Sequence, residues 1–542
     1  EPLLWRIAML SDDQCYQAIL SRDRRFDGVF FVGVSSTGIY CRSVCTVKAP
    51  MRKNCTFYPS AAAAEQANYR PCLRCRPELA PGQAKIDAVS RLATAAASRI
   101  ESGALTQQSV GALAVELGIS DRHLRRVLKQ EFGVSPIQLA QTQRLLLAKR
   151  LLSDTQLSIT DIAFASGFSS VRRLNALFQK RYRLKPSALR SATDNTIGKA
   201  TVNITEMPQD VLHCELAYRP PLNWQGLLSF LKRRAVAGVE TIENNRYQRT
   251  VRLGKHQGWI QVACLPKKNK LTVALSAGLI PVILPVLTRV KALFDLAADP
   301  LPIAKQLKDL HEQLNDAEQS DLGDSCLGIR VPGAFNGFEV AVRTVLGQQV
   351  SVKAASTLMA RLVNAVDDTI ETPIPGLTHL TPTPEQIETL PLADLSALGI
   401  LPSRGNTLLQ LAHAVTHDNL QLHNHADINA TVAALKALPG IGDWSAQYIA
   451  MRVLAYPDAF PAGDLGLRHA LKVEKPAQVL KIAEAWRPWR AYAAISLWQS
   501  LEQPSLKQPP MKQSMGQHVG KHVEQSDGNF SDRSLKQALE AS

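Results

Sequence analysis

Four cysteines in two close pairs constrain the fold of residues 1–80 more than any other feature of this chain. Three residues separate Cys41 from Cys45, two separate Cys72 from Cys75, and 26 residues lie between the pairs. Such pairs can bring four thiolates into one tetrahedron, which is how proteins close a Zn²⁺ site. Zinc-bound sulfur is held deprotonated, and a thiolate is a nucleophile. The spacing predicts one zinc ion and leaves open whether the site is structural or reactive.

The positive charge of the chain lies almost entirely in residues 1–190. These residues contain 28 Lys and Arg against 14 Asp and Glu, whereas the remainder contains 34 against 33. A basic excess of this kind predicts a polyanionic partner; a basic surface kept for solubility is the alternative. No apolar run reaches the roughly 20 residues that span a bilayer, so we expect no membrane partner. The odd number of cysteines favours the reducing cytoplasm.

Changes in composition and periodicity divide the chain of 542 residues into segments. They predict a small zinc-bound α+β domain, an all-α DNA-binding domain, a polar linker, a second α+β unit, a long helical domain and a disordered tail. The expected boundaries are 1–80, 84–190, 191–203, 204–300, 301–502 and 503–542. The fold class is therefore multidomain and mainly α.

The same sequence pattern occurs twice within residues 84–190. Each copy has a helix that ends at a glycine (Gly118, Gly167), an apolar residue, a serine expected to cap the next helix (Ser120, Ser169), and a basic helix. This is a helix-turn-helix layout whose second helix suits the major groove. The polar side chains expected to face DNA are Arg122, His123, Arg125 and Arg126 in the first copy, and Arg172, Arg173 and Asn175 in the second.

The doubled unit resembles the tandem helix-turn-helix domain of AraC-type transcription activators over about residues 85–190. The resemblance implies promoter DNA and RNA polymerase as partners.

The text around the cysteines reads GIYCRSVC, RKNCTFYPS and YRPCLRCRP. It resembles the N-terminal domain of Ada-type adaptive-response proteins over about residues 10–80. The resemblance implies that Cys41 takes a methyl group irreversibly from a methylphosphotriester in DNA, while Cys45, Cys72 and Cys75 help to hold zinc. Four arginines beside the ligands are candidates for phosphate contacts: Arg42, Arg70, Arg74 and Arg76.

The change in charge at the zinc site suggests how this reaction could regulate DNA binding. Zn²⁺ with four thiolates has a net charge of about −2, and methylation of one sulfur leaves about −1. Weaker repulsion from the phosphate backbone should then strengthen DNA binding.

The strongest motif of the C-terminal part is LPGIGDWSAQYIAM at residues 438–451. Gly440 and Gly442 leave backbone amides open between two helices, where a phosphate can bind. FPAGDLGLR follows and contains Asp464. With FEVAVRTVLGQQVSV (338–352) and WRPWRAYAAISLW (486–498), these segments resemble AlkA-type 3-methyladenine DNA glycosylase II, of the helix-hairpin-helix superfamily, over about residues 205–502.

This resemblance implies that an alkylated purine is flipped out of the duplex and excised. Asp464 would stabilise the sugar cation or orient a water, and could also cap a helix. Trp444, Tyr448 and Trp498 match aromatic positions of the base pocket, although each could simply be core. Gln349 stands where a relative inserts Leu into the minor groove, and a polar wedge fills the emptied stack less well. Leu465 replaces a Tyr of some relatives.

The position two residues after the GIG, occupied by Lys in lyases of the superfamily, is Trp444 here, so we expect a monofunctional glycosylase. A monovalent cation could bind main-chain carbonyls near Leu438 and Ile441. We therefore expect a nucleoid-associated cytoplasmic protein that repairs alkylated DNA and activates transcription. The alternative is a transcription regulator only, with a structural zinc site and a non-catalytic glycosylase-like module.

Overall fold

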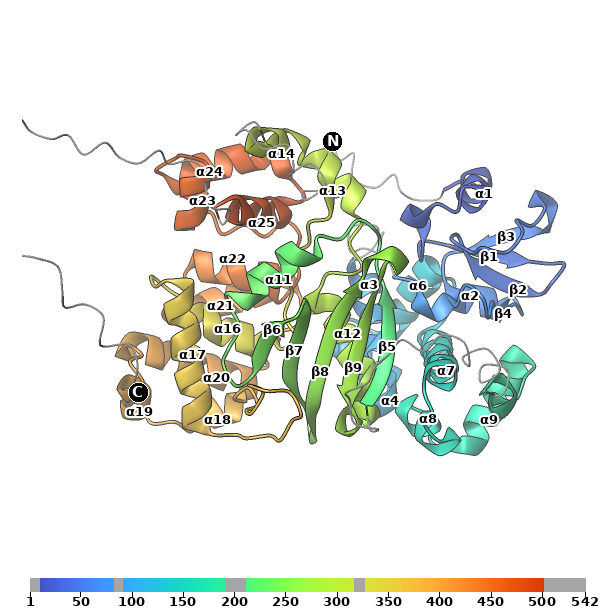
Figure 1. Ribbon diagram of the computed structural model, residues 1–542, viewed down its shortest axis with the longest axis horizontal. Coiled ribbons are helices and arrows are strands. Elements are labelled where there is room, and N and C mark those ends of the chain that lie inside the picture. The colour runs from blue at the N-terminus through green and yellow to red at the C-terminus, as the bar shows by residue number, and fades with distance from the viewer. Residues whose placement is uncertain (1–9, 82–90, 191–210, 316–326, 502–542) are drawn as a thin grey trace, which may run out of the picture. The chain divides into compact units, whose positions relative to one another are not determined.

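The computed structural model describes residues 10–81, 91–190, 211–315 and 327–501 (Figure 1). Two separate antiparallel-rich sheets and many helices make up these residues, which agrees with the predicted multidomain, mainly helical fold. The predicted linker 191–203 and the predicted tail 503–542 lie outside the described residues. Among the described helices, none is long and apolar enough to cross a membrane.

The cysteine-bearing segment is built on a four-stranded sheet. Its strands are β1 (Phe31–Val34), β2 (Ile39–Arg42), β3 (Cys55–Tyr58) and β4 (Arg70–Pro71), in the order β3-β1-β2-β4. Strand β1 pairs antiparallel with β2 and β3, while β4 runs parallel to β2. Helices α1 (Asp12–Leu20) and α2 (Ala61–Gln66) begin at the capping serines Ser11 and Ser60. The parallel β2–β4 pair brings the two cysteine pairs to one edge of the sheet.

The next segment is entirely helical. Its elements are α3 (Arg91–Glu101), α4 (Ala104–Gln107), α5 (Val110–Glu116), α6 (Asp121–Phe132), α7 (Pro136–Asp154), α8 (Ile159–Ala165) and α9 (Val171–Tyr182). Gly118 and Gly167 have φ values of +68° and +77°, the left-handed turn that the sequence predicted. Ser120 caps α6 as expected. The cap predicted at Ser169 is wrong: Ser170 caps α9, because the second turn is one residue longer.

Residues 211–276 form a five-stranded antiparallel sheet with one helix. The elements are β5 (Val211–Ala217), α11 (Trp224–Lys232), β6 (Glu240–Glu243), β7 (Arg246–Leu253), β8 (His256–Leu265) and β9 (Lys270–Ser276). The strand order is β5-β9-β8-β7-β6. Alternating burial along β5 and β9 turns one face toward a core that includes Phe230 and Phe294.

The remaining described residues are helical. Their α-helices are α12 (Ile283–Leu293), α13 (Pro300–Gln306), α14 (Lys308–Asn315), α16 (Gly337–Leu346), α17 (Val352–Val366), α18 (Pro384–Glu388), α19 (Leu392–Ala397), α20 (Pro402–Thr416), α21 (Ile428–Ala437), α22 (Asp443–Arg452), α23 (Leu465–Ala470), α24 (Pro476–Ala483) and α25 (Arg490–Ser500). Figure 1 shows α16, α20, α21 and α22 grouped beside the β6 edge of the sheet.

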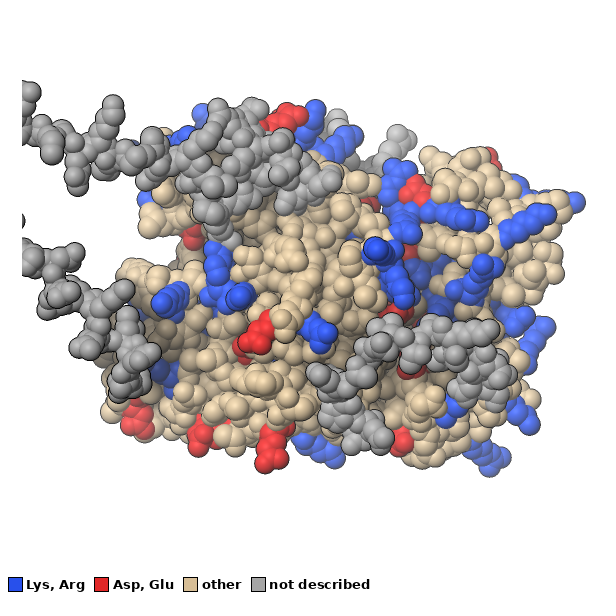
Figure 2. Space-filling model, viewed as in Figure 1, with Lys and Arg blue, Asp and Glu red and all other residues tan. Residues whose placement is uncertain are grey.

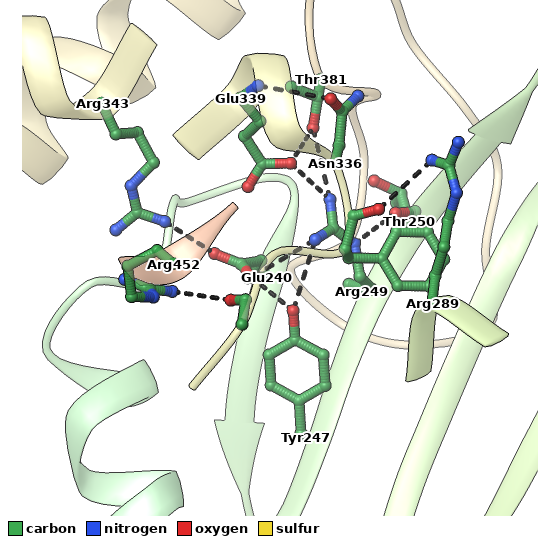
Figure 3. A network of polar contacts seen from close by, with 12 residues as sticks. Glu240, Tyr247, Arg249, Thr250, Arg289, Asn336, Glu339, Arg343, Thr381 and Arg452 are labelled. Carbon is green, nitrogen blue, oxygen red and sulfur yellow. Dashed lines mark hydrogen bonds and ion pairs between the residues drawn. The ribbon is translucent and has the colours of Figure 1, made fainter. Parts of the chain in front are cut away.

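A buried polar network fixes this sheet to the helices (Figure 3). Arg249 of β7 donates to Glu339 of α16 at 2.7 Å, and Arg343 of α16 donates to Glu240 of β6 at 3.2 Å. Burial alone would raise the pKa of the Glu339 carboxyl, but the guanidinium groups of Arg249 and Arg343 hold that pKa below its ordinary value. The network therefore sets the position of α16, the helix that leads into the loop containing Gln349.

Candidate functional sites: a thiolate cluster and an aromatic cluster

The four cysteines of the two pairs converge on one point. Cys41, Cys45, Cys72 and Cys75 place their sulfur atoms within 4.8 Å of one another. The parallel β2–β4 pairing causes this, because the N–H of Cys72 donates to the carbonyl of Tyr40 at 3.0 Å and so brings the second pair beside Cys41. Cys75 is half-buried and the other three are buried. Four sulfurs at this spacing fit a tetrahedral zinc ion.

The four sulfurs differ in their backbone contacts. N–H groups of Val47, Cys75 and Arg42 are directed at Cys45, Cys72 and Cys75 respectively. For Cys41, the largest interactions are with the three other sulfurs. The contacts with the thiols of Cys41 and then Cys75 outweigh the opposing contact with Cys72 and lower the pKa of Cys45 to about 7. Amide donors withdraw charge from a thiolate, so these contacts make the sulfurs of Cys45, Cys72 and Cys75 weaker nucleophiles.

Cys15 and Cys55, outside the pair spacing, do not belong to this cluster. Burial, followed by the charge of Asp12, raises the pKa of the Cys15 thiol to about 11. Cys15 therefore stays protonated and unreactive near neutral pH.

The arginines expected beside the ligands fall into two groups. Arg42 is buried, where it pairs with Asp27 and donates to the carbonyl of Cys75 at 3.1 Å. Arg76 pairs with Glu78 at 3.0 Å and with Asp154 at 2.7 Å. Arg74 is exposed and Arg70 is half-buried. Arg42 and Arg76 thus brace the cluster, and only Arg70 and Arg74 remain available to a phosphate.

The two basic helices expose the residues that the sequence predicted. Leu124 and Leu128 anchor α6, and Leu174 and Phe178 anchor α9. The opposite faces expose Arg122, Arg125, Arg126, Arg172, Arg173 and Asn175, with His123 half-buried. Figure 2 shows many more Lys and Arg than Asp and Glu side chains over the cysteine-bearing sheet and over α8 and α9, at the right of the view.

The hairpin between α21 and α22 is held by α20. Gly440 has a φ of +85°, and a Cβ there would lie 2.1 Å from the Thr407 hydroxyl. That hydroxyl donates to the carbonyl of Pro439 at 2.9 Å. Gly442 caps α22, and a Cβ at that residue would meet nothing within 4 Å. The first amides of α22 are therefore open to an anion.

Asp464 lies between two tryptophans. The indole N–H of Trp444 donates to its Oδ2 at 3.0 Å, and that of Trp498 donates to its Oδ1 at 2.9 Å. Oδ1 also accepts from the N–H of Leu467, so Asp464 caps α23. The side chain is half-buried and Leu465 is 71% exposed. The two indole groups and the helix cap thus fix the orientation of this partly exposed carboxylate.

Aromatic rings form a cluster beside Asp464. Trp444 stacks on Tyr448 with ring centroids 5.5 Å apart and an interplanar angle of 15°. Tyr448 and Trp498 are tilted, with centroids 6.0 Å apart. The sequence-predicted aromatic residues and Asp464 therefore come together at one place.

Three further residues contact this aromatic cluster and were not predicted from the sequence. Phe230 of α11 lies 6.5 Å from Trp498 by ring centroids, and the guanidinium groups of Arg234 and Arg452 lie 3.6 and 5.0 Å from its ring. Burial alone would raise the pKa of Tyr448, but Arg452 and Arg234 outweigh burial and lower it to about 8. No motif links α11 to α22, so only the tertiary fold reveals this group.

Gln348 and Gln349 occupy the loop after α16. Gln348 donates to the carbonyl of Gly440 at 2.7 Å and to the Ser445 hydroxyl at 3.0 Å. Gln349 is exposed, with a φ of +55°. The loop therefore presents Gln349 outward from the same region as the hairpin.

Comparison with known proteins gives matches along most of the chain. Residues 14–78 match the metal binding domain of Ada and residues 113–192 a helix-turn-helix domain. Residues 213–336 match the AlkA N-terminal domain, and residues 342–477 match the HhH-GPD superfamily of base excision DNA repair proteins. The resemblances that the motifs indicated are confirmed.

Three curated relatives span different parts of the chain. The probable bifunctional transcriptional activator/DNA repair enzyme AlkA of Mycobacterium tuberculosis is 36% identical over 507 residues, which is 92% of this chain and 98% of the relative. DNA-3-methyladenine glycosylase 2 of Escherichia coli is 32% identical and covers 52% of this chain and 95% of its own length. The bifunctional transcriptional activator/DNA repair enzyme Ada of Escherichia coli is 35% identical over 29% of this chain and 43% of its own length.

Proposed function

Because this chain belongs to the family of bifunctional transcriptional activator/DNA repair enzymes, we propose that it excises alkylated purines of the 3-methyladenine type from DNA. The observation that carries the proposal is the carboxylate of Asp464, oriented by Trp444 and Trp498 beside a cluster of aromatic rings. The hairpin amides beyond Gly440 hold a phosphate, and Gln349 enters the space left by the flipped nucleotide.

Excision needs one broken bond. As the N-glycosidic bond breaks, its electrons leave with the purine and positive charge develops on the sugar. The Asp464 carboxylate stabilises that charge, and a water oxygen then bonds to the sugar carbon and releases one proton to solvent, which leaves a hydroxyl group on the sugar. Trp444, Tyr448 and Trp498 offer aromatic faces to the flipped base. Trp444 stands where lyases carry Lys, so the excision is monofunctional.

We also propose that Cys41 accepts a methyl group from DNA methylphosphotriesters. Bound by Cys41, Cys45, Cys72 and Cys75, Zn²⁺ would keep the sulfur atoms deprotonated. The Cys41 sulfur attacks the methyl carbon, the carbon–oxygen bond breaks, and the phosphodiester leaves with its electrons. The amide contacts of the three other sulfurs support this choice. Arg70 and Arg74 are the available phosphate contacts.

Methylation turns a thiolate into a thioether and lowers the negative charge near the DNA. The exposed side chains of α6 and α9 then bind promoter DNA more tightly and the protein activates transcription through RNA polymerase. We infer that the protein works at the nucleoid in the cytoplasm. We also propose that a monovalent cation binds main-chain carbonyls near Leu438 and Ile441.

An assay of free base released from alkylated duplex DNA separates this proposal from a protein that only binds DNA. The repair enzyme releases 3-methyladenine above the spontaneous rate over many turnovers. A regulator with a non-catalytic glycosylase-like module binds the same DNA and leaves the spontaneous rate unchanged.

A further inference from the structure

A second group of metal-ligand side chains lies outside the two sites described above. Glu388 ends α18, and His413 and His417 lie in and just after α20. Nδ1 of His413 is 2.8 Å and Nε2 of His417 is 3.1 Å from the same carboxylate oxygen of Glu388. One ligand atom from each residue can be chosen so that all three lie within 4.8 Å of one another. Neither the thiolate cluster nor the aromatic cluster beside Asp464 includes these residues.

The backbone fixes the positions of these three side chains. The spacing of four residues puts His413 and His417 on one helix face, with ring centroids 4.6 Å apart. Thr383 and Gln386 form a capping box that holds α18, and Ile387 packs in the core beside Glu388. Helices α18 and α20 run next to each other (Figure 1). The two imidazoles are about half exposed, so an ion can reach them from solvent.

The imidazoles and the carboxylate are joined by hydrogen bonds in this structure, and an ion that replaced the shared protons would need only a small increase in these separations. Bonds of about 2.0–2.1 Å place neighbouring ligand atoms roughly 3.3 Å apart, close to the nitrogen–oxygen separations at Glu388. Two imidazoles and a carboxylate are ligands that zinc accepts, with a fourth position left to water. We propose that Glu388, His413 and His417 form a second zinc site, separate from the four-cysteine cluster.

The location of this site gives it a structural consequence. The N-terminal half of α20 holds the region of the hairpin, because Arg404 donates to the carbonyl of Gln348 and Thr407 to that of Pro439. An ion between Glu388 and the two histidines ties the other end of the same helix to α18. Because the ion binds the folded state, it stabilises the part of the chain that carries the hairpin.

Zinc titration of the full-length protein tests the proposal. The starting material contains one zinc per chain, held by the cysteines, with free zinc removed. Calorimetry should then show a second zinc bound by the wild type and by Glu385→Gln, which removes an exposed carboxylate from the same helix. Glu388→Gln should weaken that binding by roughly tenfold or more, and His413→Ala/His417→Ala should abolish it. The second zinc should raise the melting temperature of the wild type and of Glu385→Gln. It should not raise the melting temperature of the double histidine variant.

Two results would overturn the proposal. One is a wild-type protein that takes up no zinc beyond the first. The other is second-zinc binding that keeps its affinity in Glu388→Gln and in the double histidine variant. Cadmium-113 spectra add an independent readout, since a nitrogen–oxygen site gives a signal separate from that of a four-sulfur site, and that signal should be lost in both variants. Circular dichroism verifies folding, and Glu388→Gln decides the matter if the double variant does not fold.

Discussion

The indole N–H of Trp498 donates a hydrogen bond of 2.9 Å to Oδ1 of Asp464. This contact connects α25, the last described helix, to the residue that caps α23. This hydrogen bond orients one carboxylate oxygen, while a hydrogen bond from Trp444 orients the other. The catalytic proposal therefore depends on residues from three helices.

Trp498→Phe keeps an aromatic face and removes the N–H donor. Loss of one hydrogen bond to a charged group costs about 1.5–3 kcal/mol, so we expect base release to slow roughly tenfold or more. Trp489→Phe is the matched control, since Trp489 is also buried beside α25 but does not contact Asp464. Equal rates in the two variants would contradict this role of Trp498. Thermal unfolding should confirm that both remain folded.

The lowered pKa of Tyr448 predicts that the stability of the folded protein depends on pH. Its pKa of about 8 in the folded protein lies below the ordinary value of 10.0. Because the folded state loses its proton first, Tyr448 adds stability above pH 10 that is lost as the pH falls through about 8. The advantage of the wild type over Tyr448→Phe should therefore grow between pH 8 and pH 10, by at most about 2–3 kcal/mol. Urea unfolding across this range measures it, and a constant difference would show that the phenol keeps its ordinary pKa.

Gly440 and Gly442 should respond differently to alanine. At Gly440 the left-handed backbone and the Thr407 hydroxyl, 2.1 Å from a Cβ, both oppose a side chain. We expect Gly440→Ala to lower the free energy of unfolding by roughly 1–2 kcal/mol or more. Gly442→Ala meets open space and should leave that free energy nearly unchanged. Equal destabilisation in thermal or urea unfolding would contradict the hairpin geometry.

Cys41→Ser tests the methyl acceptor. The variant should lose transfer of labelled methyl from methylphosphotriester DNA, because the hydroxyl is a far weaker nucleophile than a thiolate. Cys15→Ser, a buried thiol outside the cluster, should keep stoichiometric transfer of one methyl per chain. Peptide mapping locates the label. Label on Cys75, the one residue of the four that is half-buried rather than buried, would reassign the nucleophile.

Local features were readable from the sequence because they depend on neighbours along the chain. Such local features include the close cysteine pairs, the left-handed turns at Gly118 and Gly167, and the hairpin glycines. Even there, one extra turn residue moved the α9 cap to Ser170.

Long-range packing explains what the sequence could not predict. Arg42 looked like a phosphate contact, yet the fold buries it against Asp27. Phe230 of α11 and Arg234, two residues beyond the end of that helix, lie more than 200 residues before Arg452, and only tertiary packing brings them together. Likewise, no spacing rule brings Glu388 of α18 to the histidines of α20.

The most direct test of the account compares single-turnover release of 3-methyladenine by the wild type and by Asp464→Asn, on the same alkylated duplex with enzyme in excess. Asparagine keeps the size and the helix cap but lacks the negative charge that opposes the sugar cation. We predict a fall of about 10²–10³-fold in rate with DNA affinity largely retained. Equal release by the two proteins, or wild-type release no faster than the spontaneous reaction, would contradict the central claim that Asp464 is the catalytic carboxylate.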